Sequence, residues 1–145
     1  LAAEKEVTMR RSTLALLALA CLLQPTAAQF KPLKPLDLKE ADPALAEDIF
    51  GPWEIRDKNG KKRCRIVLRK ETTAGSFAID IPESCGKTFP VLREIGGWRL
   101  LESWTIDLVD ANWRTRVRFS TPDDNYVAIP EVDGIDRLVK PAGKK

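Results

Sequence analysis

The sequence predicts an all-β fold: an eight-stranded antiparallel up-and-down β-barrel with a short N-terminal helix and one disulfide. From Trp53 onward, apolar and polar residues alternate with a period of two along successive segments, as in strands that bury one face. Six segments alternate in this way, and residues 97–101 and 135–140 bring the count to about eight. Eight is the number at which a small barrel closes and leaves no free strand edge.

The expected strands are short and are separated by turn residues. The stretch DKNGK at residues 57–61 carries the Asn-Gly pair that is typical of a tight hairpin. The segments expected to form strands are residues 53–57, 63–69, 76–81, 97–101, 104–110, 113–119, 125–130 and 135–140.

Two helical stretches are expected beside the strands. Asp42 suits an N-cap, Pro43 suits the first helical position, and Gly51 is expected to end this first helix. The stretch at residues 86–97, directly after Cys85, has a capping residue, an early proline and a double glycine. We therefore expect one or two helical turns there, covering one end of the barrel.

The N-terminal region has the order of a secretory signal peptide. Met9 is followed by two arginines, an apolar run at residues 13–23 and a stretch of small residues. The apolar run is short for a membrane span and is followed closely by Pro25. We expect residues 1–28 to comprise upstream residues and a signal peptide cleaved after Ala28, which leaves Gln29 first and the protein periplasmic or secreted.

Cys21 leaves an alternative open. The stretch ALAC at residues 18–21 partly resembles a lipoprotein signal, in which the cysteine is lipidated and becomes the new N-terminus. In the other interpretation, Cys21 is an ordinary residue of a discarded signal. Contact with a membrane is expected only if Cys21 is lipidated.

Removal of the signal leaves an even pair of cysteines, Cys64 and Cys85, in an oxidising compartment. The chain has no histidine, so a zinc site would lack half of its ligands and a cysteine nucleophile would lack its usual base. We expect a structural disulfide, which would add about 3 kcal/mol to stability by closing a loop of about twenty residues.

Charge and composition disfavour two classes of function. The 24 basic and 21 acidic residues interleave and form no basic stripe, so no nucleic-acid partner is expected. Without histidine, a nucleophile elbow or a phosphate-binding loop, the sequence shows no arrangement that catalysis requires, and Asp123 and Asp124 are expected to be turn residues. We therefore expect no enzyme activity, no cofactor and no bound metal.

Residues 29–41 are expected to form a flexible N-terminal arm, and residues 42–145 a barrel domain that is a monomer. The arm contains two Lys-Pro-Leu repeats and too little apolar material to pack alone, which favours an extended or polyproline conformation. Its apolar residues Phe30, Leu33 and Leu36 either anchor in a partner's cleft or belong to a disordered tether.

Three motifs, in their order along the chain, resemble those of the bacterial alkaline metalloprotease inhibitor family, often called Inh. They are the glycine and tryptophan at residues 51–53, the cysteine pair, and the Pro-x-Leu followed by Gly-Trp at residues 90–98. The resemblance covers about residues 42–140. It implies an eight-stranded barrel of lipocalin-like shape, a disulfide between Cys64 and Cys85, and a secreted zinc metalloprotease of the serralysin type as the partner.

The resemblance also implies a mechanism. The free α-amino group of the inhibitor approaches the protease zinc, and the following residues lie in the substrate cleft. The residues that would make this contact are Gln29, Phe30, Lys31, Pro32 and Leu33.

Barrel loops brace the contact in this family, and Trp113, beside an expected turn, is the candidate here. Trp53, Trp98 and Trp104 are expected in the core.

The sequence departs from the family pattern in ways that bear on function. The arm is longer than the family's trunk, and Trp113 stands near a turn where the family commonly has glycine. Cyclisation of Gln29 to pyroglutamate, or lipidation of Cys21, would remove the free amine. An envelope-associated binding protein that inhibits no protease therefore stays open as an alternative; a barrel that holds a small apolar ligand is disfavoured because large apolar residues fill the inward positions.

Overall fold

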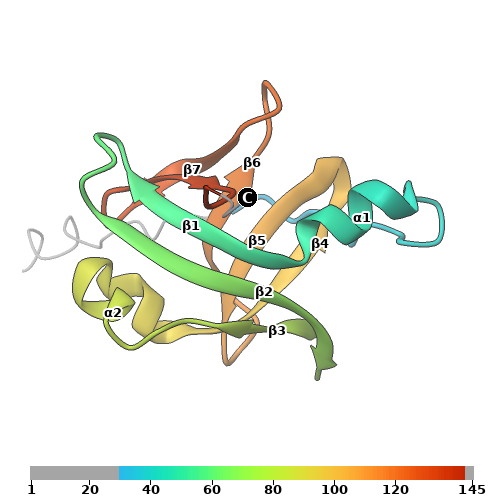
Figure 1. The fold of residues 1–145 in the computed structure, drawn as a ribbon. Helices are drawn as coiled ribbons and strands as arrows, with labels where there is room; N and C mark the ends of the chain where they lie inside the picture. The colour runs from blue at the N-terminus through green and yellow to red at the C-terminus, as the bar shows by residue number, and fades with distance from the viewer. Residues whose placement is uncertain (1–29, 143–145) are drawn as a thin grey trace, which may run out of the picture.

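The computed structural model describes residues 30–142, in which eight antiparallel strands form a closed barrel (Figure 1). Each strand pairs with its neighbours in sequence, and the first also pairs with the last. The strands are β1 (Gly51–Asp57), β2 (Arg63–Thr73), β3 (Ser76–Asp80), β4 (Ile95–Leu101), β5 (Thr105–Asp110), β6 (Thr115–Ser120), β7 (Tyr126–Val132) and β8 (Ile135–Val139). The predicted up-and-down barrel is confirmed.

A short helix, α1 (Pro43–Ile49), precedes the barrel as predicted. The Asp42 side chain caps it by accepting a hydrogen bond from the Ala44 N–H at 2.9 Å, and Pro43 occupies the first turn. The helix ends at Ile49, earlier than the expected Gly51, because Phe50 already has an extended backbone. Gly51 instead opens β1 with a φ of 114°, a conformation that favours glycine.

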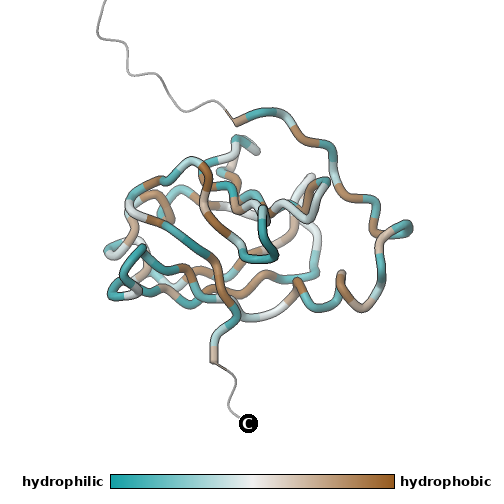
Figure 2. The backbone as a smooth tube through the Cα atoms, turned by 90° about the horizontal axis from the view of Figure 1, so that it is seen from above, coloured by the Kyte–Doolittle hydropathy of each residue, from teal (hydrophilic) through white to brown (hydrophobic). Residues whose placement is uncertain are grey.

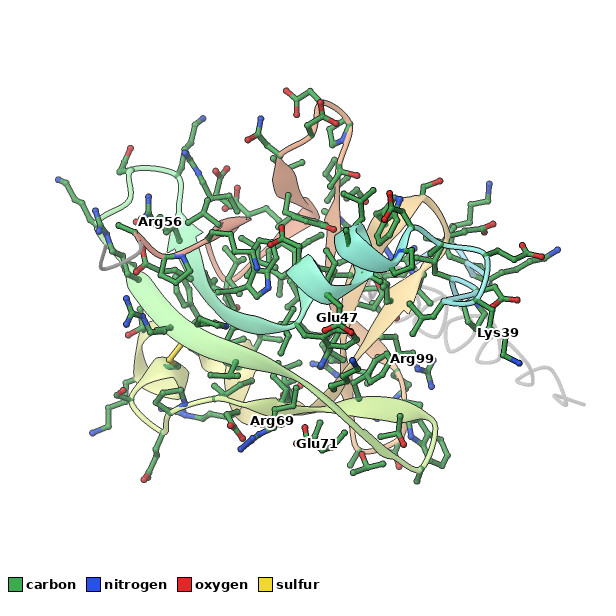
Figure 3. The ribbon with its side chains drawn as sticks, turned by 45° about the vertical axis from the view of Figure 1, so that its right-hand side comes forward. Lys39, Glu47, Arg56, Arg69, Glu71 and Arg99 are labelled. Atoms are coloured by element: carbon green, nitrogen blue, oxygen red, sulfur yellow. A yellow bond between two sulfur atoms is a disulfide. The ribbon has the colours of Figure 1, made fainter. Side chains whose placement is uncertain are left out.

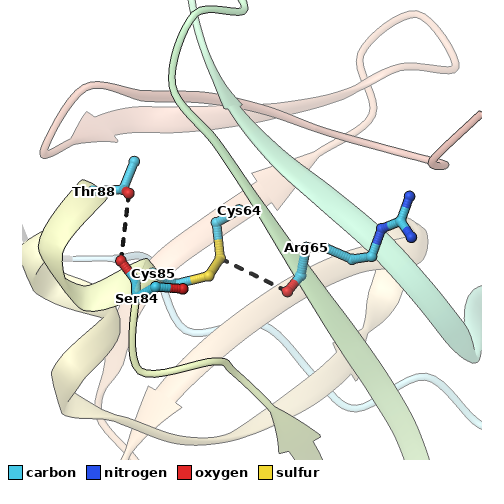
Figure 4. Close-up of a disulfide and its surroundings, with 5 residues drawn as sticks. All are labelled: Cys64, Arg65, Ser84, Cys85 and Thr88. Carbon is cyan, nitrogen blue, oxygen red and sulfur yellow. Dashed lines mark hydrogen bonds between the residues drawn. A yellow bond between two sulfur atoms is a disulfide. The ribbon is translucent and has the colours of Figure 1, made fainter.

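Two short helical segments, α2 (Cys85–Thr88) and η1 (Pro90–Glu94), lie between β3 and β4 and cover one end of the barrel (Figure 1). They contribute Phe89, Val91 and Leu92 to the core. The disulfide between Cys64 and Cys85 joins β2 to α2 with a Cα–Cα distance of 5.4 Å (Figure 4). Both predictions, the covering turns and the cysteine pairing, are confirmed. No helix within residues 30–142 has the length and apolar character needed to cross a bilayer.

Side chains from every strand meet inside the barrel. Trp98 is fully buried, stacks on Phe77 with ring centroids 4.7 Å apart, and donates its indole N–H to the Arg69 carbonyl at 3.1 Å. Trp53 is buried, and its indole N–H donates to the Ile49 carbonyl at 2.6 Å, which ties β1 to α1. The core cluster consists of Ile49, Trp53, Ile55, Cys64, Ile66, Leu68, Cys85, Phe89, Val91, Leu92, Trp98, Leu100, Ile106, Leu108, Val117, Phe119, Ile135 and Leu138.

Two tryptophans expected to begin strands lie outside them. Trp104 belongs to the helical turn η2 (Glu102–Trp104), and Trp113 belongs to the turn between β5 and β6. Their φ values, 58° and 59°, are left-handed and cannot continue an extended strand. The predicted starts of these two strands were therefore wrong, although Trp104 still packs against the core.

Candidate functional site

The middle of the arm lies along the end of β4. The Glu102 N–H donates to the Lys34 carbonyl at 2.8 Å, the Lys34 N–H donates to the Glu102 carboxylate at 3.1 Å, and the Leu36 N–H donates to the Leu100 carbonyl at 3.1 Å. The arm thus forms a short antiparallel addition to the barrel wall. The sequence predicted a flexible arm that either anchors in a partner's cleft or is a disordered tether; the structure gives these residues specific partners on the barrel.

Burial along the arm repeats every third residue. Phe30, Leu33 and Leu36 are half-buried, and the two Lys-Pro pairs between them are exposed. A period of three is that of a polyproline II helix, which the Lys-Pro-Leu repeats favour. In Figure 2 the arm crosses one side of the barrel as alternating apolar and polar segments before it turns toward α1.

A buried ion pair underlies the start of the arm. Asp107 of β5 and Arg118 of β6 are directly opposite each other, and they are 1% and 8% exposed. The Arg118 Nε and Nη2 atoms donate to the two carboxylate oxygens of Asp107, each at 2.7 Å. The hydroxyl of Thr115 donates to Asp107 Oδ2 at 2.6 Å. Because Asp107 lies between the core residues Ile106 and Leu108, this cluster faces the outer side of the barrel wall.

Arg118 also holds the arm. Its third nitrogen, Nη1, donates to the backbone carbonyl of Lys31 at 2.6 Å. The aromatic ring of Phe30 lies over the guanidinium, 5.4 Å from ring centroid to Cζ, within the range of a cation–π contact. The ion pair therefore joins the first described residues of the arm to two strands of the barrel.

A groove of about 640 Å³ separates the arm from the turn between β2 and β3. One side is formed by the arm and the other by the barrel wall. Its apolar lining residues are Leu33, Leu36, Leu38, Phe77, Leu100 and Leu101.

Trp113 is 50% exposed, which places a large aromatic side chain on the surface. Its backbone is left-handed, with a φ of 59°, a conformation that favours glycine. A methyl group added to Gly75 would lie 3.7 Å from the indole Nε1 of Trp113, so the ring lies beside the turn between β2 and β3. Gly75 also lines the groove, and the structure thereby brings Trp113 close to it.

Asp110 holds the turn that carries Trp113. Its carboxylate accepts hydrogen bonds from the N–H groups of Asn112 at 2.9 Å and Arg114 at 3.0 Å, and from the Arg114 guanidinium at 3.2 Å. Burial raises the pKa of Asp110, but these hydrogen bonds and the positive charge of Arg114 together outweigh burial and lower the pKa below 3.8. The turn is thus fixed by a carboxylate that is charged at neutral pH.

The sequence-predicted contact residues fall in three groups. Gln29 and Cys21 lie outside the described residues, as does the predicted signal peptide. The stretch 30–33 lies at the start of the described arm, beside Arg118 and the groove. Trp113 comes from a different part of the chain.

Sequence reasoning missed Asp107 and Arg118. In the sequence each is a charged residue in an alternating strand, which is the ordinary pattern of a solvent-facing position. Only the pairing of β5 with β6, and the arm above them, bury the two side chains. Across residues 30–142, no three histidine, cysteine, aspartate or glutamate side chains come together as a metal site would require.

Comparison with known protein families gives a match. A family model described as Protease inhibitor Inh matches residues 44–139, from the second residue of α1 to the last residue of β8. The match therefore spans all eight strands and begins after the arm. A comparison with curated proteins gives no match.

Proposed function

Because the chain belongs to the protease inhibitor Inh family, we propose that it inhibits a secreted zinc metalloprotease of the serralysin type by inserting its N-terminal arm into the active-site cleft. Family membership implies a protease as the partner. The zinc protease and the arm mechanism are the proposal, together with export of the inhibitor to the periplasm or the cell exterior.

The observation that carries the proposal is the ordered course of the arm along the barrel. Lys31, Lys34 and Leu36 each make backbone hydrogen bonds to the barrel wall or to Arg118. Binding a protease then orders few additional residues, and each side chain or loop that must be ordered weakens association. An arm prepared in this way is suited to a tight inhibitor.

The composition of the arm suits a protease cleft. Extended peptides bind such clefts through backbone hydrogen bonds and side-chain pockets, in the manner of an added strand. Pro32 and Pro35 fix φ near an extended value and reduce the freedom of the unbound chain. The exposed Lys-Pro pairs remain available to a partner.

The α-amino group of Gln29 would be the zinc ligand if the signal is cleaved after Ala28. An α-amino group has a pKa of about 8, so a nearby cation can bind its deprotonated form at neutral pH. An amine bound at the metal places no peptide bond over the zinc, and the arm would escape cleavage.

A second contact is proposed at Trp113. The side chain is large, aromatic and half-exposed, which is the type that dominates protein interfaces. Its turn is held by Asp110, so little freedom is lost when a partner covers it.

The test compares three forms of the protein against a serralysin-type zinc protease. The first begins at Gln29 with a verified free amine, the second lacks residues 29–33, and the third carries Trp113→Ala. We expect stoichiometric inhibition by the first, loss of inhibition by the second, and about tenfold weaker inhibition by the third. Ile129→Ala, which truncates another exposed apolar side chain, is the control for the third and is expected to leave inhibition unchanged. Equal inhibition by the full and truncated forms would refute the arm mechanism.

A further inference from the structure

We propose that the Asp107–Arg118 pair is the positioning device of the arm: it fixes where the chain leaves the barrel and so sets the inhibitory geometry without touching the protease. This inference rests on the proposed function and assigns part of it to two residues of the barrel wall. Arg118 is a positioning residue in this account, since it acts through Lys31 and Phe30.

The planar guanidinium explains how the pair sets a direction. Two of its nitrogens, Nε and Nη2, are occupied by the two oxygens of Asp107. This bidentate arrangement fixes the plane of the group, and with it the direction in which Nη1 donates. The Lys31 carbonyl lies in that direction, at 2.6 Å. A lysine at position 118 would supply a charge but no fixed plane.

The carboxylate is itself held in place. The pairing of β5 with β6 shifts register between Leu108 and Val109, so that Val109 pairs with Thr115. A shift of this kind re-aims a side chain to the other face of a strand. It brings the Thr115 hydroxyl to within 2.6 Å of Asp107 Oδ2, on the outer face of the wall.

A second attachment defines the path of the arm. Lys34 exchanges two hydrogen bonds with Glu102, and two residues, Pro32 and Leu33, lie between Lys34 and Lys31, whose carbonyl is the first attachment. Two fixed points that enclose Pro32 and Leu33 determine a direction, whereas one would leave the arm free to swing. Held at these two carbonyls, the arm stays on the barrel and presents its exposed side chains, Lys31 and Pro32 among them, together with the chain that precedes them to the cleft.

The test removes the Asp107–Arg118 pair and fills its place with apolar side chains. In the variant Asp107→Leu/Arg118→Met, hydrophobic side chains of similar volume replace the buried pair, a change that proteins often tolerate. The matched control is Arg69→Met/Asp80→Leu, which removes a 2.8 Å ion pair between β2 and β3 that has no contact with the arm. Figure 3 marks Arg69 on β2.

Two readouts separate anchoring from inhibition. Hydrogen exchange of the Glu102 amide reports the bond to the Lys34 carbonyl, and the inhibition constant against a zinc protease reports function. In Asp107→Leu/Arg118→Met we expect faster exchange at Glu102 and an inhibition constant raised about 10- to 100-fold, with the circular dichroism of the barrel unchanged. The control variant is expected to match the wild type in both readouts.

An unchanged Glu102 exchange rate, or an unchanged inhibition constant, in Asp107→Leu/Arg118→Met would overturn the inference. If that variant does not fold, Arg118→Lys compared with Arg69→Lys decides in the same way, since only the former breaks the planar geometry. If the wild type inhibits no zinc protease, the proposed function fails, and the exchange rate alone then decides whether the pair anchors the arm.

Discussion

Replacing Cys64 and Cys85 together by alanine is expected to lower the free energy of unfolding by about 3 to 4 kcal/mol and to leave inhibition by the folded protein unchanged. The two cysteines are 21 residues apart. Closing a loop of this length removes about 11 cal/mol/K of chain entropy from the unfolded state, or about 3 kcal/mol at 25 °C. Both side chains are buried, so loss of the two sulfur atoms adds up to about 1 kcal/mol.

The position of the disulfide explains why inhibition should survive. It joins β2 to α2 (Figure 4). The arm is attached elsewhere, to Glu102, which follows β4, and to Arg118 of β6. The eight strand pairings that close the barrel do not involve this bond. A folded variant should therefore present the arm as the wild type does.

The assay is urea denaturation followed by tryptophan fluorescence, for the wild type and the double alanine variant. Inhibition is measured in parallel without denaturant. Wild-type protein treated with a reducing agent serves as the control and should lose a similar amount of stability. A loss below about 1 kcal/mol would refute the entropic reasoning, and weaker inhibition by the folded variant would refute the independence of arm and disulfide.

Three other outcomes are expected. Gly97→Ala should cost about 1 to 3 kcal/mol in urea denaturation, because the new methyl group would lie 3.0 Å from the Phe77 carbonyl oxygen; Gly96→Ala, where the nearest atom is at 3.5 Å, should cost under about 0.5 kcal/mol. Equal losses would refute the packing argument. The lowered pKa of Asp110 contributes stability that is present above about pH 4 and is lost as pH falls through the folded-state value, so Asp110→Asn should flatten the decline in stability below about pH 4; parallel declines would contradict this. Burial and then the charge of Asp48 raise the pKa of Tyr126 to about 12. The phenol, the single tyrosine of the chain, should therefore be only about one tenth ionised near pH 11 in the folded protein and mostly ionised once urea unfolds it, which its absorbance reports.

Much of the barrel is predictable from local patterns. Alternation with a period of two depends only on which side chains face the core, and it located six of the strands; residues 97–101 and 135–140 were added to reach the eight of a small barrel, and both lie at strands. The N-cap Asp42 and the cysteine pair are likewise signals carried by one or two residues. These features need no knowledge of how distant segments meet.

The features that escaped prediction depend on distant contacts or on unusual backbone. Trp104 and Trp113 continue an alternating pattern in the sequence, but their left-handed φ values place them in turns. The contact between Arg118 and Lys31 joins residues 87 apart in the chain, and no local pattern signals it. The course of the arm on the barrel depends on that contact, so the sequence indicated an extended arm but not the path that it takes.

The turn that follows Asp110 is an intermediate case, predictable in part from the sequence. An aspartate ahead of a turn is a recognisable signal, because its side chain accepts from backbone N–H groups two residues on. The structure adds that this turn displays Trp113 beside Gly75. That adjacency depends on how the strands tilt in the closed barrel.

The most direct measurement for the central claim is an active-site titration of a serralysin-type zinc protease with the chain that begins at Gln29. Serine and cysteine proteases are titrated alongside as controls. The account expects one molecule of the protein to abolish the activity of one molecule of zinc protease, with no effect on the control proteases. At about micromolar concentration even a modest inhibitor would occupy most of the protease active sites. Full activity of the zinc protease in the presence of excess protein at that concentration would therefore contradict the account.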